Sequence, residues 1–573
     1  MSGYMGKSLR VDLSRGEIQV LETPAAICGE FLGGRGAGVA MVAGSIFTEA
    51  WDSPRMPIVF ATGPLVGTAA PTSGRMSVVS RSPLTGTVFD CSVGGRFGTE
   101  LKKAGFDFIE ITGQSDKWVW LDIGNGHARI EDASALQGKG TGETGLLLGK
   151  GSTAVTGIAG ENGVRYASIV FDGHYLAGRG GLGAVMGAKR LKAIRVFSGG
   201  EGKKVIVADP DGLRKAREEI MRLLRASQAV FGEFGLAEFG TTALVDLIHA
   251  RKMEPTHNFR KTLFSGSSNY SGYAMKARYR PKKTGCAGCP VLCKKISFEG
   301  VPLPEYETVS HFGALNGIDS LEAIVEANRL CNEYGIDAIS AASTIACYSE
   351  INGVKPAPEE VSALLRRIAL RDGDAGRALA EGSYRYALSM GRPELSMSVK
   401  GLELPAYDPR GAYGMALAYA TSNRGGCHLR AYPVSHEILR KPVATDRFSF
   451  EGKARIIKIA EDLNAAVDSL TACKFVFFAA GLEEYARAVS AVTGKEQNVQ
   501  SLLRTGERIW DLEHKLNAMN GFTKDDDDLP ARFFEEEGTG IIHTKKGTLT
   551  VPPIDRDAFL AARENYYTIR GYL

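Results

Sequence analysis

The chain has 573 residues, which is too long for one hydrophobic core, because single domains rarely exceed about 250–300 residues. A balance of 69 basic against 65 acidic side chains excludes the strongly basic composition of a nucleic-acid-binding protein, and 44% apolar residues exclude a disordered chain. No apolar run reaches the ~18–20 residues that cross a bilayer and no secretory signal stands at the start, so we expect a cytoplasmic protein that does not bind membranes.

Residues 1–204 are predicted to form a β-rich domain. Glycine is unusually frequent there: the chain has 69 glycines, about 12% against a usual ~7%, and 37 of them lie in the first 200 residues. Short β-branched or aromatic runs bounded by turn residues predict strands at residues 7–13, 56–61, 76–80, 108–112 and 118–123.

From residue 205 onward, apolar residues recur at intervals of three and four, which predicts helices. The clearest segments are residues 211–226, 241–251, 320–334, 359–372 and 450–472. A turn-rich stretch at residues 404–414 predicts a boundary between two helical domains, 205–408 and 409–573. The acidic run at residues 525–528 is predicted to be a solvated loop.

Three of the nine cysteines are closely spaced. The segment CAGCPVLC places Cys286, Cys289 and Cys293 on one loop that contains glycine and proline. Thiolates at this spacing are typical of iron–sulfur clusters. The alternatives are structural thiols or a zinc ion, although zinc also needs a fourth Cys or His nearby. A [4Fe–4S] cluster needs a fourth ligand too, and spacing alone leaves four candidates: Cys331, Cys347, Cys427 and Cys473.

The cysteine loop lies in a basic stretch. Residues 276–295 contain no carboxylate and seven cations: Lys276, Arg278, Arg280, Lys282, Lys283, Lys294 and Lys295. One interpretation is a solvated positive surface. The other is a docking face for an acidic electron carrier, because charge steering raises the rate of association.

Four loops of the first domain combine glycine with arginine. They lie at residues 32–36, 70–75, 92–98 and 173–183. Each offers backbone N–H groups beside a guanidinium, a combination that suits phosphate groups. None has the layout of a Rossmann site or a P-loop, and each alone fits a tight turn better than a phosphate site. Together, the four loops predict a large phosphorylated cofactor.

At this point the sequence resembles the tungsten-containing aldehyde ferredoxin oxidoreductase family, as a divergent member. The likeness covers nearly the whole chain and rests on motifs in the family's order: GKSLRVDLSRGEI, ATGPLVGTAAPTSGR, SPLTG, GGRFGTELKKAGFDFIEITG, GHYLAGRGGLGAVMGAKRLKAI, GCAGCPVLC, PEYET, TSNRGGCHLRAYP and YYTIRGYL.

The resemblance implies an α+β fold, in which a β-rich N-terminal domain of two sheets cradles the pterins and two mainly α-helical domains follow. It implies a tungsten ion between two pterins, a [4Fe–4S] cluster close by, and a magnesium ion that bridges the pterin phosphates. The sequence does not distinguish tungsten from molybdenum, because the metal would be bound by pterin sulfurs. The implied activity is oxidation of aldehydes to carboxylic acids, or the reverse, with electrons passing to a ferredoxin or a small ferredoxin-like iron–sulfur subunit. The oligomeric state stays open.

The family's functional residues can be transferred by position. Cys286, Cys289, Cys293 and Cys473 match the cluster ligands, and Arg75 matches the arginine between the cluster and a pterin. The carbonyl groups of Ser92 and Leu176 match the magnesium ligands. The glycine loops that contain these residues add the cofactor-binding candidates Gly94, Gly95, Gly178, Arg179 and Gly180.

The family grips its pterins with a DxxGL(D/C) pattern, which this chain carries twice in altered form. The copies read NEYGID at residues 332–337 and DSLTAC at residues 468–473. The implied pterin-binding residues are Asn332 and Asp337 in the first copy, and Asp468 and Ala472 in the second. Asn332 replaces an aspartate, and without charge it holds a pterin amine less strongly.

Two residues are implied to act on the substrate. His428 of CHLRAY is expected to transfer a substrate proton, and Glu307 of PEYET is expected to be its partner or to orient water. The alternatives are a solvated helix cap for Glu307 and a satisfied buried histidine for His428. Two rival functions stay open: a related tungsten enzyme subunit that reduces an acid or an aromatic thioester in a larger complex, and a subunit with a cluster alone that transfers electrons.

Overall fold

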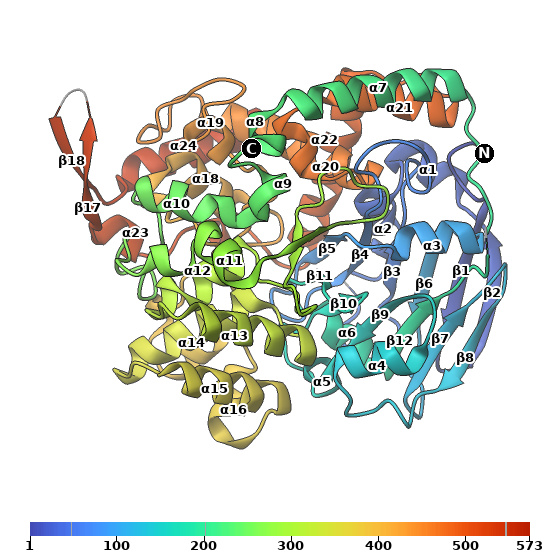
Figure 1. The fold of residues 1–573 in the computed structure, drawn as a ribbon, viewed down its shortest axis with the longest axis horizontal. Coiled ribbons are helices and arrows are strands. Elements are labelled where there is room, and N and C mark those ends of the chain that lie inside the picture. The colour runs from blue at the N-terminus through green and yellow to red at the C-terminus, as the bar shows by residue number, and fades with distance from the viewer. Residues whose placement is uncertain (47, 201, 545–546, 573) are drawn as a thin grey trace.

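The computed structural model describes residues 1–46, 48–200, 202–544 and 547–572. Its N-terminal part contains two six-stranded sheets, which confirms the predicted β-rich domain (Figure 1). The first sheet has the order β2 (Glu17–Glu22), β1 (Lys7–Asp12), β6 (Phe108–Thr112), β3 (Ile58–Ala61), β4 (Met76–Arg81) and β5 (Val88–Val93). The second has the order β11 (Tyr175–Ala177), β10 (Ile169–Phe171), β9 (Ser152–Thr156), β12 (Leu191–Val196), β7 (Val119–Ile123) and β8 (Ala128–Asp132).

Both sheets are mixed. β1 runs parallel to β6 and β12 runs parallel to β7, while the other neighbours are antiparallel. β3 is buried at all four positions, as expected for a strand with apolar neighbours on both faces. Between the sheets, the ring of Phe97 from α3 (Phe97–Ala104) meets Phe60 of β3 at 6.2 Å and Phe171 of β10 at 5.2 Å. These aromatic contacts join the two sheets into one core.

The edge strands of the two sheets approach each other. β5 ends the first sheet and β11 ends the second, and the two strands are in contact near the centre of the molecule (Figure 1). The Cys91 thiol of β5 donates to the carbonyl of Arg179, just beyond β11, over 3.2 Å. A sheet edge presents N–H and C=O groups that no neighbouring strand uses. The junction of the sheets therefore offers backbone groups to a ligand.

Helix α2 (Gly34–Val42) connects the sheets to the helical part. It packs on β3, β4 and β5 and also on α20 (Lys453–Leu470) and α22 (Val499–Met519). A Cβ atom at Gly36 would stand 2.7 Å from Ile509 of α22, and one at Gly38 would overlap Val79 of β4. Glycine therefore allows the close approach that places Arg35, on the same helix, inside the molecule.

The region after residue 205 is mainly helical, as predicted. Four of the five predicted segments form α7 (Pro210–Ala226), α13 (Leu321–Tyr334), α15 (Pro358–Leu370) and α20. Their starts follow local sequence: the Asp209 carboxylate caps α7 by accepting from Gly212, and the Ser320 hydroxyl caps α13 by accepting from Ala323. The segment 241–251 is divided between a 3-10 turn (Gly240–Ala243) and α10 (Leu244–Ala250).

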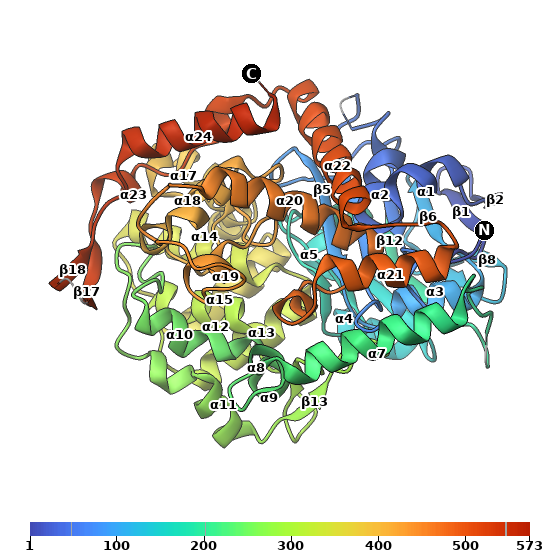
Figure 2. The same ribbon diagram turned by 90° about the horizontal axis from the view of Figure 1, so that it is seen from above.

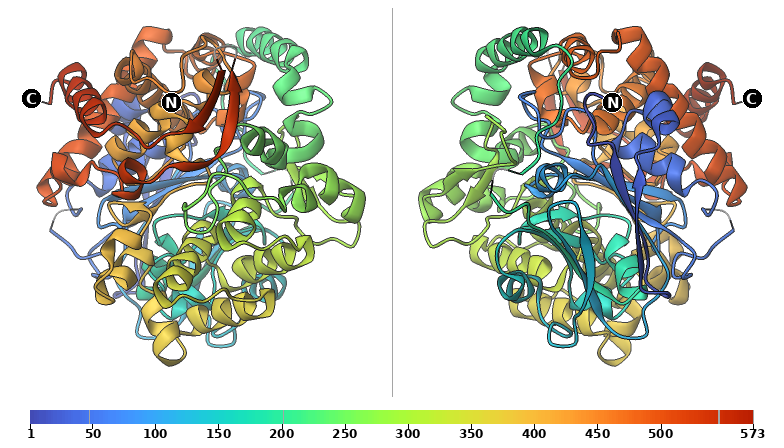
Figure 3. Two further views of the ribbon diagram at one scale, coloured as in Figure 1. Left: turned by 90° about the vertical axis from the view of Figure 1, so that its left-hand side faces the viewer. Right: turned by 90° about the vertical axis from the view of Figure 1, so that its right-hand side faces the viewer.

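Long helices from separate parts of the chain lie together. α7 runs beside α21 (Leu482–Thr493), as Figure 2 shows from above, and α24 (Arg556–Arg570) packs on α20. The remaining major helices are α12 (Tyr306–Phe312), α14 (Ala338–Asn352) and α18 (Tyr413–Thr421). The hairpin of β17 (Gly538–Thr544) and β18 (Gly547–Val551) projects from the end of the molecule that lies away from the sheets (Figures 1 and 3). None of the described helices is long and apolar enough to cross a membrane.

The turn-rich stretch at residues 404–414 is buried throughout. At its centre Arg410 and Asp408 form a fully buried ion pair, with nitrogen and oxygen 2.7 Å apart. The stretch therefore lies inside the helical part rather than on its surface. The division of that part into two domains at residue 408 stays a prediction.

Candidate active site

The cysteine loop is held between two short strands, β13 (Lys282–Thr284) and β14 (Lys294–Ile296). Its Ala287 N–H donates to the carbonyl of Gly95 over 3.0 Å, and a Cβ atom at Gly94 would overlap the Cys286 sulfur. From the other side, the Cys473 N–H donates to the carbonyl of Thr72 over 3.0 Å. The loops at residues 70–75 and 92–98 therefore bring the distant Cys473 and the cysteine loop to one place.

The electrostatics of the thiols agree with this placement. Burial is the main cause that raises the pKa of Cys289 to about 11, and the charges of Cys473 and Cys286 raise it further. Burial and the charge of Cys473 also raise the pKa of Cys293. Mutual repulsion of this kind requires sulfurs that lie close together. The protonated thiols would lose their protons on binding a cluster, which makes loading favoured at higher pH.

No three His, Cys, Asp or Glu side chains of the described residues lie close enough to hold a single metal ion. In a [4Fe–4S] cubane each cysteine binds a different iron, so the four sulfurs stand further apart than around one ion. The donor set of four partly buried thiols fits the cubane.

Arg75 lies between this cluster site and the sheet junction. Its Nε donates to the hydroxyl of Ser92 over 3.0 Å and its Nη2 to the carbonyl of Ser92 over 2.7 Å. Although burial acts to lower the pKa of Arg75, the charges of Cys473, Cys286 and Asp468 raise it. The Arg75 guanidinium therefore lies near both the thiols and Asp468, which belongs to a second group of charged residues.

That second group is a buried cluster of arginines and carboxylates from three parts of the chain. Arg35 donates to Glu513 of α22 through two hydrogen bonds of 2.7 and 2.6 Å and lies 3.7 Å from Asp468 of α20. Arg430 bonds to Asp90 of β5. Although burial acts to raise the pKa of Asp90, Arg430 and Arg35 hold it well below its usual range.

Several atoms of this cluster lack partners. Four buried atoms of this cluster make no hydrogen bond to any described residue: Arg35 Nη1, Arg430 Nε, Arg430 Nη1 and Asp468 Oδ1. Each such atom costs about 1–3 kcal/mol if it stays unsatisfied, so a ligand is the expected partner. The missing partner must offer acceptors to the guanidinium groups and a donor to the carboxylate. A phosphorylated pterin has phosphate oxygens, ring carbonyl groups and ring N–H groups, so the residues present fit it.

The two altered pterin-binding motifs have the same backbone geometry. In the first, α13 ends at Gly335 with φ of 70°, and the Ile336 N–H donates to the Cys331 carbonyl over 2.8 Å. In the second, α20 ends at Thr471 with φ of 59°, and the Ala472 N–H donates to the Val467 carbonyl over 3.1 Å. A β-branched residue rarely adopts a positive φ, so the turn at Thr471 is maintained by its surroundings.

The acidic and amide residues of the two motifs differ in their contacts. Asp337 caps α14, accepts from the Ser340 hydroxyl over 2.8 Å and lies 3.4 Å from Arg179. Asp468 lies 2.8 Å from Lys474. The Asn332 carbonyl accepts from Thr141 over 2.7 Å, and no hydrogen bond of its side chain joins it to another described residue. The assignment of these residues to pterins stays a prediction.

The glycine loops differ in where they place their arginines. Arg35 and Arg179 are buried and half-buried Arg75 points inward, whereas Arg96 is exposed and pairs with Asp172 at 3.7 Å. A Cβ atom at Gly180, where φ is 76°, would stand 2.6 Å from Phe89. Three of the four loops therefore face the interior, and the loop at residues 92–98 contributes its backbone instead.

The predicted magnesium ligands lie on the two edge strands. Ser92 is in β5 and Leu176 is in β11, so the contact between these strands brings them to the same junction. The Ser92 carbonyl already accepts from Arg75, which leaves one lone pair for a cation. Gly178 lies between Leu176 and Arg179 and can offer a ligand only its backbone. Its carbonyl accepts from the Ser168 hydroxyl over 2.8 Å.

Glu307 and His428 face each other. Glu307 is in the first turn of α12, and its Oε2 accepts from the Ala406 N–H over 2.9 Å. Its Oε1 lies 3.6 Å from His428 Nε2, too far for a hydrogen bond. Glu307 Oε1 and His428 Nδ1 are both buried without a partner among the described residues. This geometry excludes the solvated-cap alternative for Glu307 and leaves both groups open to a ligand or water.

Burial shifts the pKa of both groups. It raises the pKa of Glu307 to about 8, and it lowers the pKa of His428, with further lowering by the positive charges of Arg179 and Arg424. At neutral pH the carboxyl is therefore largely protonated and the imidazole is neutral. A neutral imidazole can accept a proton, and a protonated carboxyl can donate one, so the pair suits acid–base chemistry.

The raised pKa of Glu307 leads to a prediction about stability. Glutamate titrates near 4.5 in the unfolded chain and near 8 in the folded chain. The folded state therefore binds the extra proton between these values, and stability falls as pH rises through this window. The Glu307→Gln variant cannot lose this proton. As pH rises from 5 to 8.5, we therefore expect the free energy of unfolding of the cofactor-free variant to increase by up to roughly 4 kcal/mol relative to that of wild type.

Urea unfolding at both pH values measures this difference. The matched control is Glu326→Gln, because Glu326 is an exposed carboxylate paired with Arg329 and should show no such pH dependence. If the stability difference between Glu307→Gln and wild type is the same at pH 5 and pH 8.5, the pKa of Glu307 is not raised.

Cys427, which spacing alone left as a candidate for the fourth cluster ligand, has its contacts in the segment that carries His428. Among the cysteines, Cys331, Cys347 and Cys427 lie outside the cluster site, but Cys427 accepts from Arg424 Nη2 over 3.0 Å and from the Leu429 N–H over 3.3 Å. Burial acts to raise its pKa, yet Arg424 and Arg430 outweigh burial and lower it to about 7. The thiol therefore orders the loop that presents His428.

The sequence did not predict five charged residues that lie at or beside the site: Arg35, Arg424, Arg430, Lys474 and Glu513. The available signal was their position: Arg35 lies in a glycine–arginine loop, and Arg424 and Arg430 lie in the motif TSNRGGCHLRAYP. His436, in contrast, lies near this motif but points away from the site, because its Nδ1 bonds to the carbonyl of Val443 at 3.1 Å.

The basic stretch around the cysteine loop is less positive than its sequence indicates. Lys283 pairs with Glu238 at 2.7 Å, Lys276 shares the same carboxylate, and Arg278 pairs with Glu322 at 3.0 Å. Buried Lys295 donates to the carbonyls of Ala237 and Leu292 instead of pairing with a carboxylate. Of the exposed cations in this stretch, two form no ion pair with any described residue: Arg280 and Lys282. These two carry the unbalanced charge of the surface.

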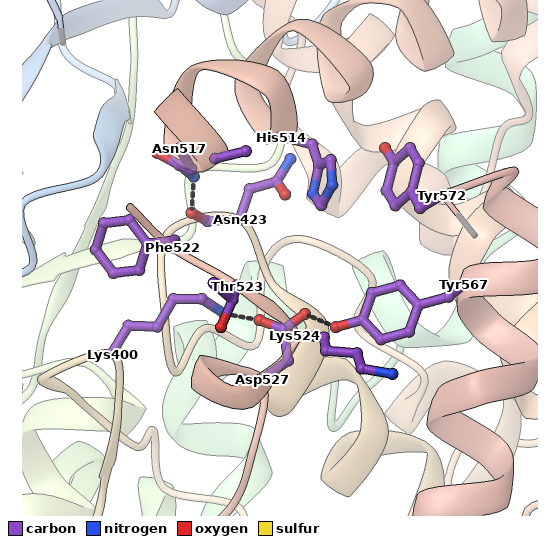
Figure 4. A pocket seen from close by; sticks show the side chains of 11 residues that line it. Lys400, Asn423, His514, Asn517, Phe522, Thr523, Lys524, Asp527, Tyr567 and Tyr572 are labelled. Atoms are coloured by element: carbon purple, nitrogen blue, oxygen red, sulfur yellow. Dashed lines mark hydrogen bonds and ion pairs between the residues drawn. The ribbon is translucent and has the colours of Figure 1, made fainter. Parts of the chain in front are cut away.

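A cavity of about 230 Å³ lies beside Lys400 and Asn423 (Figure 4). It is lined by residues of α22, α24 and the chain between them, and the His514 ring stacks on Tyr572 with 3.9 Å between centroids. On its wall Asp527 is buried against Lys400 and Tyr567, so the predicted solvated loop at residues 525–528 is wrong for Asp527. The lining includes neither Glu307 nor His428, which separates this cavity from the site.

Comparison with known proteins gives the same result along the whole chain. The model of the aldehyde ferredoxin oxidoreductase N-terminal domain matches residues 8–198, and the model of aldehyde ferredoxin oxidoreductase domains 2 and 3 matches residues 215–573.

Individual relatives match over full length. The tungsten-containing aldehyde ferredoxin oxidoreductases of Pyrococcus furiosus and Thermococcus kodakarensis are each 39% identical, over 100% of this chain and 97% of theirs. A WOR-like subunit of an aliphatic sulfonate oxidoreductase from Pyrococcus furiosus is 28% identical over 100% and 95%. Among solved structures, the active-site complex BamBC of benzoyl coenzyme A reductase with 1,5-dienoyl-CoA has a TM-score of 0.83 at 23% identity, over 100% of this chain and 95% of that chain. This last likeness shows the shared fold.

Proposed function

The chain belongs to the aldehyde ferredoxin oxidoreductase family, and from this premise we propose that it oxidises aldehydes to carboxylic acids and passes the electrons to a ferredoxin-type carrier. The observation that carries the proposal is the meeting of two sites: four thiols around Arg75, and buried arginines and carboxylates with unsatisfied atoms on its other side. The charged cluster adjoins the loop of His428, because Arg430 follows His428 by two positions and bonds to Asp90, and Lys474, next to Cys473, donates to the Leu429 carbonyl over 2.8 Å.

The proposed cofactors are a tungsten ion held by two pterins, a [4Fe–4S] cluster and a magnesium ion. Cys286, Cys289, Cys293 and Cys473 would hold the cluster, and the unpartnered atoms of Arg35, Arg430 and Asp468 would hold a pterin. The Ser92 and Leu176 carbonyls would hold magnesium. When bound, the tungsten centre would supply Lewis acidity and a two-electron acceptor, and the cluster would transfer the electrons singly.

The reaction consumes water and releases two protons and two electrons for each aldehyde converted to an acid. Among the residues of this chain, His428 and Glu307 are proposed to transfer the proton that the substrate or its water releases. His428, neutral at pH 7, accepts a proton from the substrate or its water at the ring nitrogen that faces Glu307. Glu307, held by the Ala406 N–H, orients the water or returns the proton. The buried surroundings of both groups exclude bulk water.

The electron carrier is proposed to dock over the cysteine loop. Leu292, between two cluster cysteines, is 37% exposed. The unbalanced cation Lys282 begins β13, the strand that leads to the loop, and Arg280 lies two residues before it. An acidic carrier would be attracted to these charges, and an attraction of this kind weakens as salt screens it.

We therefore expect Lys282→Gln combined with Arg280→Gln to slow carrier reduction several-fold at low ionic strength and little at high ionic strength. The matched control is Lys276→Gln, whose charge is shared with Glu238 and should matter less. The measurement is the rate of carrier reduction across a salt series, with a small uncharged dye as reference. An equal loss at every salt concentration would contradict docking through these charges.

The function itself is tested with purified protein that carries its metals. Dye-linked assays with a panel of aldehydes and acids, at high and low potential, separate aldehyde oxidation from acid reduction. We expect aldehyde-dependent dye reduction. Reduction of a carboxylic acid or aromatic thioester alone would favour a subunit of a reductase complex. Electron transfer without any organic substrate would favour a subunit that carries a cluster alone.

A further inference from the structure

A row of aromatic rings leads away from the Glu307–His428 pair. The centroid of the His428 ring lies 5.6 Å from Tyr407 and 6.0 Å from Tyr432. Tyr432 meets Phe478 edge to face at 6.2 Å, and Phe478 stacks on Phe475 at 6.2 Å. Tyr407 precedes His428, Tyr432 follows it, and the two phenylalanines follow Cys473, so the fold assembles rings from three segments in one row that begins at His428.

The outer rings are not fully packed. Tyr407 is buried, whereas Tyr432, Phe475 and Phe478 are half-buried. The side chains of His428 and Glu307 keep 11% and 18% of their surface accessible. A core ring normally loses all its exposure to its neighbours, so the accessible surface of these side chains is available for contact with a bound molecule.

Tyr432 is fixed in an unusual position. Its φ is 53°, a conformation that residues other than glycine rarely adopt and that occurs where the surroundings impose it. Its hydroxyl lies 3.2 Å from that of Tyr407, and its carbonyl accepts from the Ser435 hydroxyl over 3.1 Å. Both ends of the residue are therefore held, and the ring lies edge to face with the His428 ring.

The wall carries no charge of its own. The nearest cation in sequence is Lys474, and its ammonium group is engaged by Asp468 at 2.8 Å and by the Leu429 carbonyl at 2.8 Å. A phosphorylated or carboxylated substrate would find no free counter-ion along this row. A flat apolar ring, in contrast, would gain edge-to-face and stacked contacts with aromatic neighbours.

We propose that Tyr432, Phe475 and Phe478 line the substrate pocket and select aldehydes whose carbonyl carbon is attached to an aromatic ring. The proposal rests on the proposed aldehyde oxidation, since it names the substrate class of the same site. It assigns these residues to specificity: they position the substrate ring, while His428 and Glu307 handle the proton.

Steady-state kinetics with benzaldehyde and acetaldehyde test the selection. We expect the wild-type kcat/KM for benzaldehyde to exceed that for acetaldehyde at least about tenfold. Phe478→Leu keeps an apolar side chain but removes the ring, and it should lower this ratio about threefold to tenfold, mainly through KM for benzaldehyde. Phe478→Tyr retains the ring and should retain the ratio.

The matched control is Phe450→Leu. Phe450 is also half-buried and stacks on another ring, Tyr413, at 5.0 Å, but it lies outside the row. The control should leave the ratio unchanged. A wild-type ratio near one, or an equal loss of the ratio in Phe450→Leu and Phe478→Leu, would overturn the proposal. Tungsten and iron contents are measured for each variant, so that loss of cofactor is not taken for loss of selectivity.

A binding measurement separates this proposal from the proposed function. Saturation-transfer NMR on the purified full chain reports binding of benzoate and of acetate without turnover. We expect benzoate to bind about tenfold more tightly than acetate, and Phe478→Leu to reduce that preference. If benzoate is preferred but no aldehyde is oxidised by fully loaded protein, the proposed function fails and the aromatic selectivity stands. If aldehydes are oxidised but benzoate and acetate bind equally, the selectivity fails.

Discussion

The His428→Ala variant is expected to oxidise aldehydes about 10²–10⁴-fold more slowly than wild type, the usual contribution of a positioned acid–base group. Burial and the nearby guanidinium groups lower the pKa of the imidazole, so at neutral pH it is free to accept a proton. Its Nε2 faces Glu307, and its Nδ1 has no partner among the described residues. Loss of the ring removes the only imidazole that faces Glu307 Oε1 in the described part of the chain.

Dye-linked oxidation of a single aldehyde measures this effect, with tungsten and iron contents determined on the same samples. The matched control is His436→Ala: His436 lies eight positions further along the chain, bonds to the Val443 carbonyl and should leave the rate unaffected. Most of the wild-type rate in His428→Ala with full metal content would show that the proton is handled elsewhere.

The Cys473→Ala variant is expected to lose the intact four-iron cluster and, with it, reduction of the electron carrier. A cubane is held by four cysteine ligands, and Cys473 is the one that comes from outside the loop. The substitution spares the backbone contact at this position, because the Cys473 N–H that donates to Thr72 is retained in alanine. Loss of the cluster would therefore follow from the missing sulfur rather than from a displaced chain.

Iron and sulfide analysis, together with visible absorption, measures the outcome. Cys347→Ala is the matched control, because Cys347 is a buried thiol of α14 whose sulfur has a single distant contact, the Ser383 carbonyl at 4.0 Å. Full iron content in Cys473→Ala would contradict the ligand assignment.

Local features of the fold were predictable from sequence. The β-branched runs at residues 7–13 and 108–112 became neighbouring strands, and the caps at Asp209 and Ser320 start helices where the residues indicate. These features depend on a few adjacent residues, so their physical cause is visible in a short window. Residues matched to separate family motifs also lie close together in the structure, as the hydrogen bonds between the loops around Arg75 show.

Features that depend on distant partners were not predictable. Arg35 and Glu513 are separated by 478 positions, and nothing local indicates their paired hydrogen bonds. The basic stretch was misjudged for the same reason, because Glu238 reaches Lys276 and Lys283 from a separate helix. Asp527 was assigned to a solvated loop, yet Lys400 and Tyr567 bury it from two sides. In each case tertiary contacts between remote residues set the charge environment.

The central proposal is that this chain seats a tungsten–pterin centre and a cubane side by side. Elemental analysis of the purified protein by mass spectrometry tests it most directly. We expect one tungsten atom for every four iron atoms, since a cubane contains four irons. Iron without tungsten, or tungsten without iron, would contradict it.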